Sequence, residues 1–276
     1  MSTLTKKTDK ELAFLHDLFI APDWGERFAE LIDEHVEFPK EAKVAYLAAG
    51  TGSHAISIQE RVGDKLKLIC LDESEACLEL ARAKAMTESE NTEFQQGFLD
   101  DLNFPDNDFD VVVANASLIS SDRVDKILSE MVRIATPGGT IAIALPTASS
   151  FGEFFSIYWE ALHNVGLIDL ESDVETLITE LPTTSEIEKM TEEVGLEDVS
   201  SWTRVEEFDY ESGEQFLNSP LVADFLMHGW LASVPETSRE KVTREIARLI
   251  NEERHEAEFA LSVKSTLVVG RKAQTH

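Results

Sequence analysis

The stretch Lys43-Val-Ala-Tyr-Leu-Ala-Ala-Gly-Thr-Gly-Ser-His54 decides the fold of this chain. It opens as a short apolar run and ends in Gly50-Thr-Gly52, after which residues 53–62 have the spacing of a helix. Glycines between a strand and a helix allow a tight turn and let a ligand approach the backbone closely. The first N–H groups of the helix attract an anion. We therefore expect a strand–turn–helix unit that binds a ligand.

A second apolar run, Lys67–Leu71, leads to Asp72, twenty positions after Gly52. An acidic side chain at the tip of the second strand can accept hydrogen bonds from both hydroxyls of a ribose. However, Gly50, Gly52 and Ala55 also fit the G-x-G-x-x-G/A pattern of dinucleotide-binding dehydrogenases. The turn alone leaves the ligand open, and by itself it indicates no more than a tight turn.

Short apolar runs continue to alternate with helical patterns further along the chain. Strands are predicted over 43–49, 67–71, 109–114, 140–145 and 261–270, and helices over 53–62, 73–86 and 122–134. This alternation indicates an α/β fold with a doubly wound, parallel sheet.

Helical patterns flank this core on both sides. The first forty residues predict two helices separated by Pro22. After Pro146, Ser150-Phe-Gly-Glu153 has the form of a capping box that opens an aromatic-rich helix. Further helical segments are predicted over 185–194 and 211–260, around an extended stretch at 199–208. We predict three parts: a helical extension (1–40), a Rossmann-like core (41–146), and helical cap insertions with the last helix and strands of the sheet (147–276).

Four segments in this order resemble the motifs of the class I S-adenosylmethionine-dependent methyltransferases. They are Tyr46–His54, Leu71–Ser74 with the helix after it, Gln96–Asp110 with its Phe-Pro-Asp-x-x-Phe-Asp pattern, and Leu128–Gly139 with its Pro-Gly-Gly turn. The resemblance covers residues 41–146 well and implies a mostly parallel, seven-stranded Rossmann-like sheet. It also implies S-adenosyl-L-methionine as the cofactor.

The resemblance further implies which residues bind the cofactor. These are Ala48, Gly50, Thr51, Gly52, Asp72, Glu73, Phe98, Leu99 and Asn115. Gly50–Gly52 would pass under the methionine part, Asp72 would hold the ribose, and Glu73 would lie beside the adenine. Phe98 and Leu99 would line the adenine pocket. Asn115 would face the methionine end and the transferring methyl group.

Three positions depart from the family pattern. Ala48 stands where the family usually has an acid, and His54 replaces a common third glycine. Phe98 stands where an acid often reaches the adenine amino group, so that either Asp100 or Asp101 substitutes or Phe98 packs on the purine face. A lost charge-assisted hydrogen bond costs about 1.5–3 kcal/mol. A non-enzymatic binding module with a degenerate site is therefore an alternative.

Charge and composition restrict the partners. The 276 residues carry 24 basic and 53 acidic side chains, a formal net charge of −29. This acidity disfavours nucleic acid and anionic membrane surfaces, whereas 43% hydrophobic residues suffice for a core. We find no membrane-spanning run or secretory signal, and the only cysteines, Cys70 and Cys77, are expected to be reduced. We expect a cytoplasmic protein without a metal site, as a monomer or homodimer.

The segments that would cover the acceptor are rich in aromatics and poor in cations. Neither Ile134–Glu188 nor Val205–Ser238 contains Lys or Arg, the side chains that grip a phosphate or polyanion. Their aromatic residues include Phe151, Phe154, Phe155, Tyr158, Trp159, Phe225 and Trp230. They either pack as the core of a cap or line an apolar acceptor pocket. We expect a neutral or cationic, partly hydrophobic small molecule as the methyl acceptor.

The sequence identifies no catalytic base. His163 and His228 lie in the cap segments and His54 lies at the turn, but each also fits a structural role. Asn115-Ala-Ser-Leu118 lacks the Asn-Pro-Pro-Tyr signature of enzymes that methylate amino groups on nucleic acid or protein. The favoured function is S-adenosylmethionine-dependent methyl transfer to a small molecule. A binding module, or less favourably an NAD-dependent oxidoreductase, is the alternative.

Overall fold

The computed structural model describes residues 7–88, 92–253 and 259–274. Contacts divide the chain into two compact units. The first is made up of Met1–Leu145, Thr184–Trp202 and Thr266–His276, and the second of Pro146–Thr183 and Thr203–Ser265. The division into 1–40, 41–146 and 147–276 stays a prediction.

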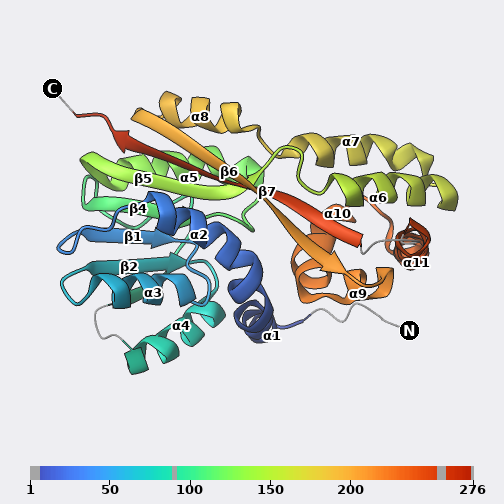
Figure 1. The fold of residues 1–276 in the computed structure, drawn as a ribbon, viewed down its shortest axis with the longest axis horizontal. Coiled ribbons are helices and arrows are strands. Elements are labelled where there is room, and N and C mark those ends of the chain that lie inside the picture. The colour runs from blue at the N-terminus through green and yellow to red at the C-terminus, as the bar shows by residue number, and fades with distance from the viewer. Residues whose placement is uncertain (1–6, 89–91, 254–258, 275–276) are drawn as a thin grey trace. The chain divides into compact units, whose positions relative to one another are not determined.

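A seven-stranded sheet organises the first unit, with the strand order β3-β2-β1-β4-β5-β7-β6 (Figure 1). Its strands are β1 Lys43–Leu47, β2 Lys67–Asp72, β3 Thr92–Gln96, β4 Phe109–Asn115, β5 Ala135–Thr147, β6 Leu196–Tyr210 and β7 Phe259–Lys272. The pairs β1–β2, β1–β4, β2–β3 and β4–β5 are parallel. The predicted doubly wound, mostly parallel, Rossmann-like sheet is confirmed.

The register of the sheet brings three strand ends together. Leu47 at the end of β1 pairs with Leu71 on one side and with Ala114 on the other. The residues that follow them are Ala48, Asp72 and Asn115. Because ligands of open α/β sheets bind beyond the carboxyl ends of the strands, this edge is where a cofactor site is expected.

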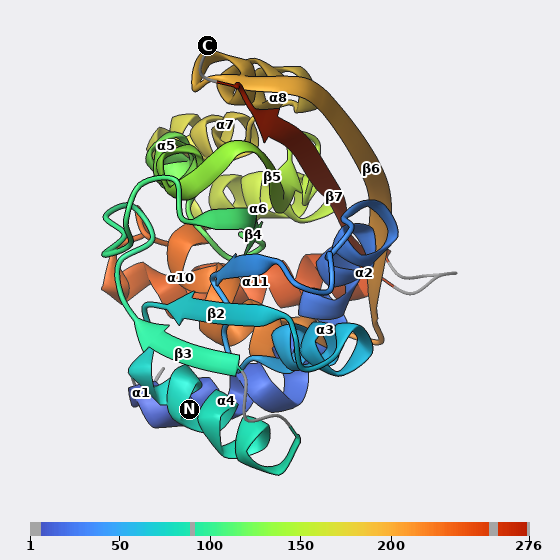
Figure 2. The ribbon, with the colours of Figure 1, turned by 90° about the vertical axis from the view of Figure 1, so that its left-hand side faces the viewer.

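Helices cover both faces of the sheet in the first unit. Figure 2 shows α2 and α3 on one side of the strands and α5 on the other. The α-helices of this unit are α1 Asp9–Leu15, α2 Glu26–His35, α3 Ser53–Val62, α4 Glu75–Glu88, α5 Val124–Ile134 and α8 Thr184–Glu193. In α5, Ile127, Leu128 and Met131 are fully buried, so the apolar stripe predicted for this helix forms its sheet-facing side.

The predicted break at Pro22 is wrong. A π-helical segment, His16–Gly25, joins α1 to α2 and contains Pro22. Proline has no amide proton and its ring clashes with the preceding turn of an α-helix. The wider π-helical turn accommodates it, so residues 9–35 form one helical run.

Three other elements differ from the predictions. Strand β5 begins at Ala135, so the Pro137-Gly138-Gly139 turn lies inside the strand, where its pairing with β4 shifts register. Strand β3 is an edge strand with the polar sequence Thr-Glu-Phe-Gln-Gln, and it lacks the apolar run that marks its neighbours. Helix α7, Glu171–Glu180, buries only Val174 and gives a weak periodic signal.

The predicted capping box at Ser150–Glu153 does not form. The Ser150 hydroxyl donates to the carbonyl of Thr147 (2.6 Å) and accepts from the amide of Lys264 (2.9 Å). The Glu153 carboxylate instead accepts from the hydroxyl of Ser262 (2.7 Å). Contacts with β7 therefore replace the local cap, and α6 begins at Gly152.

The second unit is helical around an aromatic core. Its α-helices are α6 Gly152–Val165, α7, α9 Gly213–Asn218, α10 Met227–Trp230 and α11 Glu236–Glu253, with 3-10 turns at Ile168–Leu170 and a π-helical segment at Leu221–Leu226. The ring of Phe154 stacks on Trp230 (4.2 Å between centroids) and packs against Phe216 (5.6 Å). Most aromatic residues of α6 therefore form the interior of this unit. Among the described helices of the chain, none is both long and apolar enough to span a membrane.

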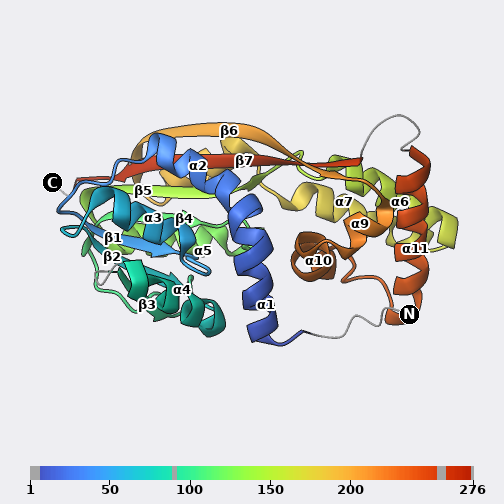
Figure 3. The same ribbon diagram turned by 60° about the horizontal axis from the view of Figure 1, so that its bottom comes forward.

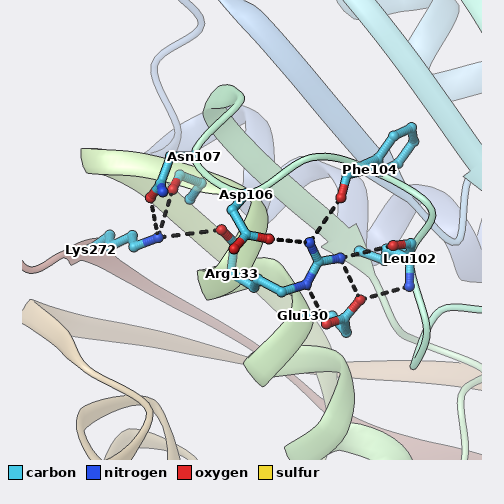
Figure 4. Close-up of polar contacts among 8 residues, drawn as sticks. Leu102, Phe104, Asp106, Asn107, Glu130, Arg133 and Lys272 are labelled. Atoms are coloured by element: carbon cyan, nitrogen blue, oxygen red, sulfur yellow. Dashed lines mark hydrogen bonds and ion pairs between the residues drawn. The ribbon is translucent and has the colours of Figure 1, made fainter.

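Arg133, in the last turn of α5, fastens the loop between β3 and β4 (Figure 4). Its guanidinium donates to the carbonyl oxygens of Leu102 and Phe104, both at 2.8 Å. It also donates to the carboxylates of Asp106 (2.7 Å) and Glu130 (2.7 and 2.8 Å). The planar fork of arginine can satisfy all of these acceptors at once, whereas lysine cannot.

Lys272 of β7 extends this network to the far side of the loop. Its ammonium donates to the side-chain oxygen of Asn107 (2.7 Å) and to the carbonyl of Ala135 (2.9 Å). The loop that carries Phe98 and Leu99 is therefore held at its far end by α5 and β7.

We expect the substitution Arg133→Met to lower the free energy of unfolding by about 2–3 kcal/mol, because it leaves several partly buried acceptors without a donor. Urea unfolding followed by circular dichroism measures this loss.

Lys189→Met is the control. Its ion pair with Glu193 in α8 is exposed, with 74% and 63% of the two side chains accessible, so the loss should stay below about 0.5 kcal/mol. Equal losses in the two variants would contradict a special role of Arg133.

Candidate functional site

The turn after β1 adopts a backbone that few residues tolerate. Ala48, Gly50 and Gly52 have φ of +53°, +53° and +77°. A Cβ at Gly52 would lie 2.9 Å from both Ala81 and Phe94, so that this position requires glycine. The left-handed conformation of Ala48 costs about 1–2 kcal/mol. Such strain is found mainly where surrounding contacts fix the backbone for a function.

Asp72 connects this turn to the tip of β2. Its Oδ2 accepts from the amide of Gly50 (2.7 Å), and its Oδ1 accepts from the amide of Ser74 (2.9 Å). Burial raises the pKa of Asp72, while these two amides oppose the rise. Each carboxylate oxygen has two lone pairs, so Asp72 can hold the turn and still accept from two ribose hydroxyls.

Helix α3 begins directly after the turn, with Gly52 at its N-cap position. Thr51 is fully buried between the two glycines. With no side-chain cap on the helix, its first N–H groups face the turn. This end of α3 suits the carboxylate of an amino acid group.

Glu73 is engaged within the protein. Its carboxylate pairs with the guanidinium of Arg123 (2.5 Å) and accepts from the amide of Leu99 (3.1 Å). The bonds from Arg123 hold the pKa of Glu73 below its ordinary value. Arg123 also pairs with Asp100 (3.1 Å), so Asp100 is committed to this network. Glu73 therefore anchors the start of the predicted adenine loop.

Phe98 and Leu99 lie at opposite extremes of exposure. Phe98 is 68% exposed, which leaves its ring available to cover a planar ligand. Leu99 is 2% exposed and packs in the core of the first unit. The structure therefore separates these two predicted neighbours of the adenine.

Asn115 lies at the end of β4 and contacts the N-terminal helical run. Its side-chain nitrogen donates to the carbonyl of Gly25 (3.2 Å), and its oxygen accepts from the amide of Ser117 (3.4 Å). Ala48, Asp72 and Asn115 thus lie at the carboxyl ends of three adjacent strands, at one edge of the sheet.

His54 is bonded to side chains of β1 and α2. Its Nδ1 is hydrogen-bonded to the hydroxyl of the buried Tyr46 (2.7 Å), and its Nε2 lies 3.1 Å from Asp33 of α2. Asp33 also pairs with Arg61 (2.6 Å). The departure at His54 therefore supplies a structural link between β1, α2 and α3.

His16 was missed by the sequence reasoning. A Cβ at Gly50 would lie 2.6 Å from Cε1 of His16, so the imidazole ring packs directly on the turn. Burial lowers the pKa of His16 to about 4, which keeps the ring neutral at pH 7. No local motif marks His16, because the contact depends on how the N-terminal helical run packs on the turn.

His163 and His228, the two cap candidates for a base, lie in the second unit. The side chain of His163 is 64% exposed and lies 3.5 Å from Glu171, and His228 is exposed. Neither has the buried, oriented environment that is typical of a catalytic base.

The residues at the sheet edge fit S-adenosylmethionine. The helix start suits the methionine carboxylate, the carboxylate of Asp72 suits the ribose, and the exposed ring of Phe98 suits a purine face. The fit rests on an acceptor with spare lone pairs and on a turn whose backbone a Cβ would obstruct.

Comparison with known proteins identifies relatives of this chain. Residues 44–139 match a family described as a methyltransferase domain. A demethylmenaquinone methyltransferase from Lactococcus lactis is 35% identical over 118 residues, which are 41% of this chain and 47% of that protein. The chain thus spans about half the length of this relative.

Solved structures share the fold. The YcgJ protein of Bacillus subtilis superposes with a TM-score of 0.60 at 18% identity, covering 91% of this chain and all of that one. Phosphoethanolamine N-methyltransferase 2 of Haemonchus contortus, solved with phosphomonomethylethanolamine and S-adenosylhomocysteine, gives 0.58 at 16% identity. That match covers 98% of this chain and 58% of the other.

The matched domain, the order of the motifs and the parallel sheet agree with one another, and the Haemonchus contortus enzyme is solved both with S-adenosylhomocysteine and with S-adenosyl-L-methionine. Residues 44–139 therefore match a methyltransferase domain, and the fold is one that solved methyltransferase structures share.

Proposed function

We propose that this protein binds S-adenosylmethionine at the carboxyl edge of its sheet and transfers the methyl group to a neutral or cationic, partly hydrophobic small molecule. The observation that carries the proposal is the bond between the Gly50 amide and Asp72 (2.7 Å), which assembles the glycine turn and the ribose acceptor into one site.

In this proposal each predicted residue has a task. Gly50, Thr51 and Gly52 hold the methionine part beneath the start of α3, and Asp72 accepts from the ribose. Asn115 borders the methyl group from the end of β4. Ala48 shapes the turn through its left-handed backbone. Glu73 and Leu99 act indirectly, by ordering the loop that presents Phe98.

The cofactor supplies an activated methyl group on a sulfonium, which is a good leaving group. The protein then has to align the acceptor with the methyl group at about 3–3.5 Å and exclude water. A base is needed only when the acceptor atom must lose a proton. Alignment is therefore the main task of the chain, which agrees with a site that offers no evident base.

A pocket in the second unit supports the predicted acceptor class. Its volume is about 400 Å³, within the range of small-molecule sites. The lining residues are Ser149, Ser150, Gly152, Phe155, Ser156, Trp159 and Ile178. None of them is charged, and Ser149 follows the end of β5 by two residues.

Backbone strain occurs at the same place. Ser149 and Phe151 have φ of +72° and +63°, although neither is glycine. Strain of this kind is common at binding sites. The name of the Lactococcus lactis relative, a demethylmenaquinone methyltransferase, also supports a neutral, partly apolar acceptor. The cytoplasmic location and the monomeric or dimeric state stay predictions.

Incubation with S-adenosylmethionine labelled in its methyl group tests this function. One arm receives neutral and cationic small molecules extracted from cells, and the other receives phosphorylated metabolites. We expect a labelled product in the first arm. Label only in the phosphorylated arm would contradict the proposed acceptor, and cofactor binding without label in either arm would favour a binding module.

We expect Asp72→Asn to weaken S-adenosylmethionine binding about 10- to 100-fold, a change of about 1.4–2.8 kcal/mol. The amide replaces an acceptor oxygen by a donor group, which can neither hold the Gly50 amide nor accept from a ribose hydroxyl. Isothermal titration calorimetry measures the dissociation constant.

Asp125→Asn is the matched control, since Asp125 is an exposed carboxylate in the first turn of α5. It should bind the cofactor as the unmodified protein does. Normal binding by Asp72→Asn would show that Asp72 does not contact the cofactor.

The pocket yields a separate expectation. Ile178→Ala should raise KM about 3- to 10-fold for an acceptor that the labelling experiment identifies, because the substitution removes apolar contact area from the pocket. Ile168→Ala is the control, an isoleucine of the same unit that is also exposed (51% against 45%) but lies outside the pocket. Steady-state kinetics at saturating cofactor compares them, and equal KM values for both variants would exclude the pocket as the acceptor site.

A further inference from the structure

The N-terminal helical run, residues 9–35, packs at the carboxyl edge of the sheet, where Gly25 contacts Asn115 and His16 contacts Gly50. Figure 3 shows α1 and α2 as one continuous helical path. Its inward side is apolar and buried, as shown by Ala13, Ile20, Trp24 and Phe28. The run interrupts its α-helical pattern only over His16–Gly25. Such π-helical segments occur frequently at functional sites.

His16 is the side chain of this run that meets the glycine turn. The three heavy atoms nearest to a Cβ at Gly50 all belong to the His16 ring, at 2.6, 3.0 and 3.5 Å. A molecule that lies along the turn at Gly50 must therefore touch this ring or displace it.

The turn itself offers few polar side chains to an amino acid group. Between Ala48 and Gly52, only Thr51 has a polar side chain, and it is fully buried. The methionine end of S-adenosylmethionine carries both an ammonium and a carboxylate. The start of α3 suits the carboxylate, so a side chain that lies against the ammonium must come from another element, and His16 is already in contact with the turn.

An ion pair fastens the run next to His16. The carboxylate of Asp17 lies 2.6 Å from the ammonium of Lys84 on α4, and Lys84 also donates to the hydroxyl of Ser53 (2.9 Å). Ser53 is the first residue of α3. The pair therefore ties the N-terminal run to the helix that starts at the glycine turn.

A second ion pair also joins the N-terminal run to α4, but it lies at the surface. Lys10 and Glu79 are 3.1 Å apart, with 73% and 53% of their side chains exposed, against 31% and 26% for Lys84 and Asp17. Exposed pairs are worth little. The chain thus contains a matched comparison for the Asp17–Lys84 pair.

We propose that His16 is a cofactor-positioning residue, and that the Asp17–Lys84 ion pair latches the N-terminal helical run against the glycine turn and thereby slows cofactor release. This inference rests on the proposed function, because it requires that the turn bind S-adenosylmethionine. It assigns to the N-terminal run the contact that the side chain of Ala48 does not provide.

The test uses the full chain and the variants His16→Ala, His16→Gln, Lys84→Met and Lys10→Met. Calorimetry gives the dissociation constant for S-adenosylmethionine, and stopped-flow displacement by S-adenosylhomocysteine gives the release rate. Hydrogen exchange of residues 9–35 is followed with and without cofactor.

We expect His16→Ala to weaken cofactor binding at least tenfold, and His16→Gln, which keeps a polar group of similar reach, to recover part of the loss. Lys84→Met should speed release about fivefold or more and raise hydrogen exchange in residues 9–35. Lys10→Met should change each quantity less than twofold. In the unmodified protein, the cofactor should slow exchange in this run.

Two results would overturn the inference. One is that Lys84→Met releases the cofactor at the same rate as Lys10→Met, and that both His16 variants bind the cofactor as tightly as Lys10→Met does. The other is exchange in residues 9–35 that does not respond to the cofactor. Unfolding midpoints recorded without cofactor separate a folding defect from a binding defect. If the unmodified protein does not bind S-adenosylmethionine, this result instead rejects the proposed function and this inference with it.

Discussion

The hydrogen bond from the Gly50 amide to Asp72 is the contact on which the rest of the site depends. It joins the turn after β1 to the tip of β2, and it does so with the carboxylate proposed to hold the ribose. Parallel pairing places both strand ends at one edge, next to the end of β4. The left-handed backbone at Ala48, Gly50 and Gly52 then brings the start of α3 to the same place. One partly buried carboxylate thus joins the strand ends of this sheet edge into a candidate binding site.

The charged side chains of this acidic chain are distributed differently in the two units. In the first unit, Arg123 and Arg133 are used internally: each gathers carboxylates that order the loop between β3 and β4. In the second unit, the described pocket is lined without any charge, in a chain whose formal net charge is −29. Such a pocket provides no cation for a phosphate, and the surrounding acidity repels anions. We therefore propose that the uncharged lining of the pocket and the negative charge of the rest of the chain together select a neutral or cationic acceptor.

Much of the fold could be predicted because its signals are local. Apolar runs and the glycine turn indicated β1, β2, β4 and the helices between them, and the spacing to Asp72 indicated the ribose acceptor. What could not be predicted depends on distant contacts. Pro22 does not end the helical run, because the wider π-helical turn at His16–Gly25 accommodates the proline ring. Ser150 bonds to Lys264 instead of capping its helix. The neutral His16 reaches Gly50 from an element thirty-four positions earlier, and nothing in its own neighbourhood marks it.

We infer that the site formed by Gly50 and Asp72 takes S-adenosylmethionine rather than a dinucleotide. Calorimetric titration of the unmodified protein with S-adenosylmethionine, S-adenosylhomocysteine and NAD tests it most directly. We expect both S-adenosyl compounds to bind in the micromolar range, with one site per chain, and NAD to give no heat. Binding of NAD without a response to either S-adenosyl compound would contradict it.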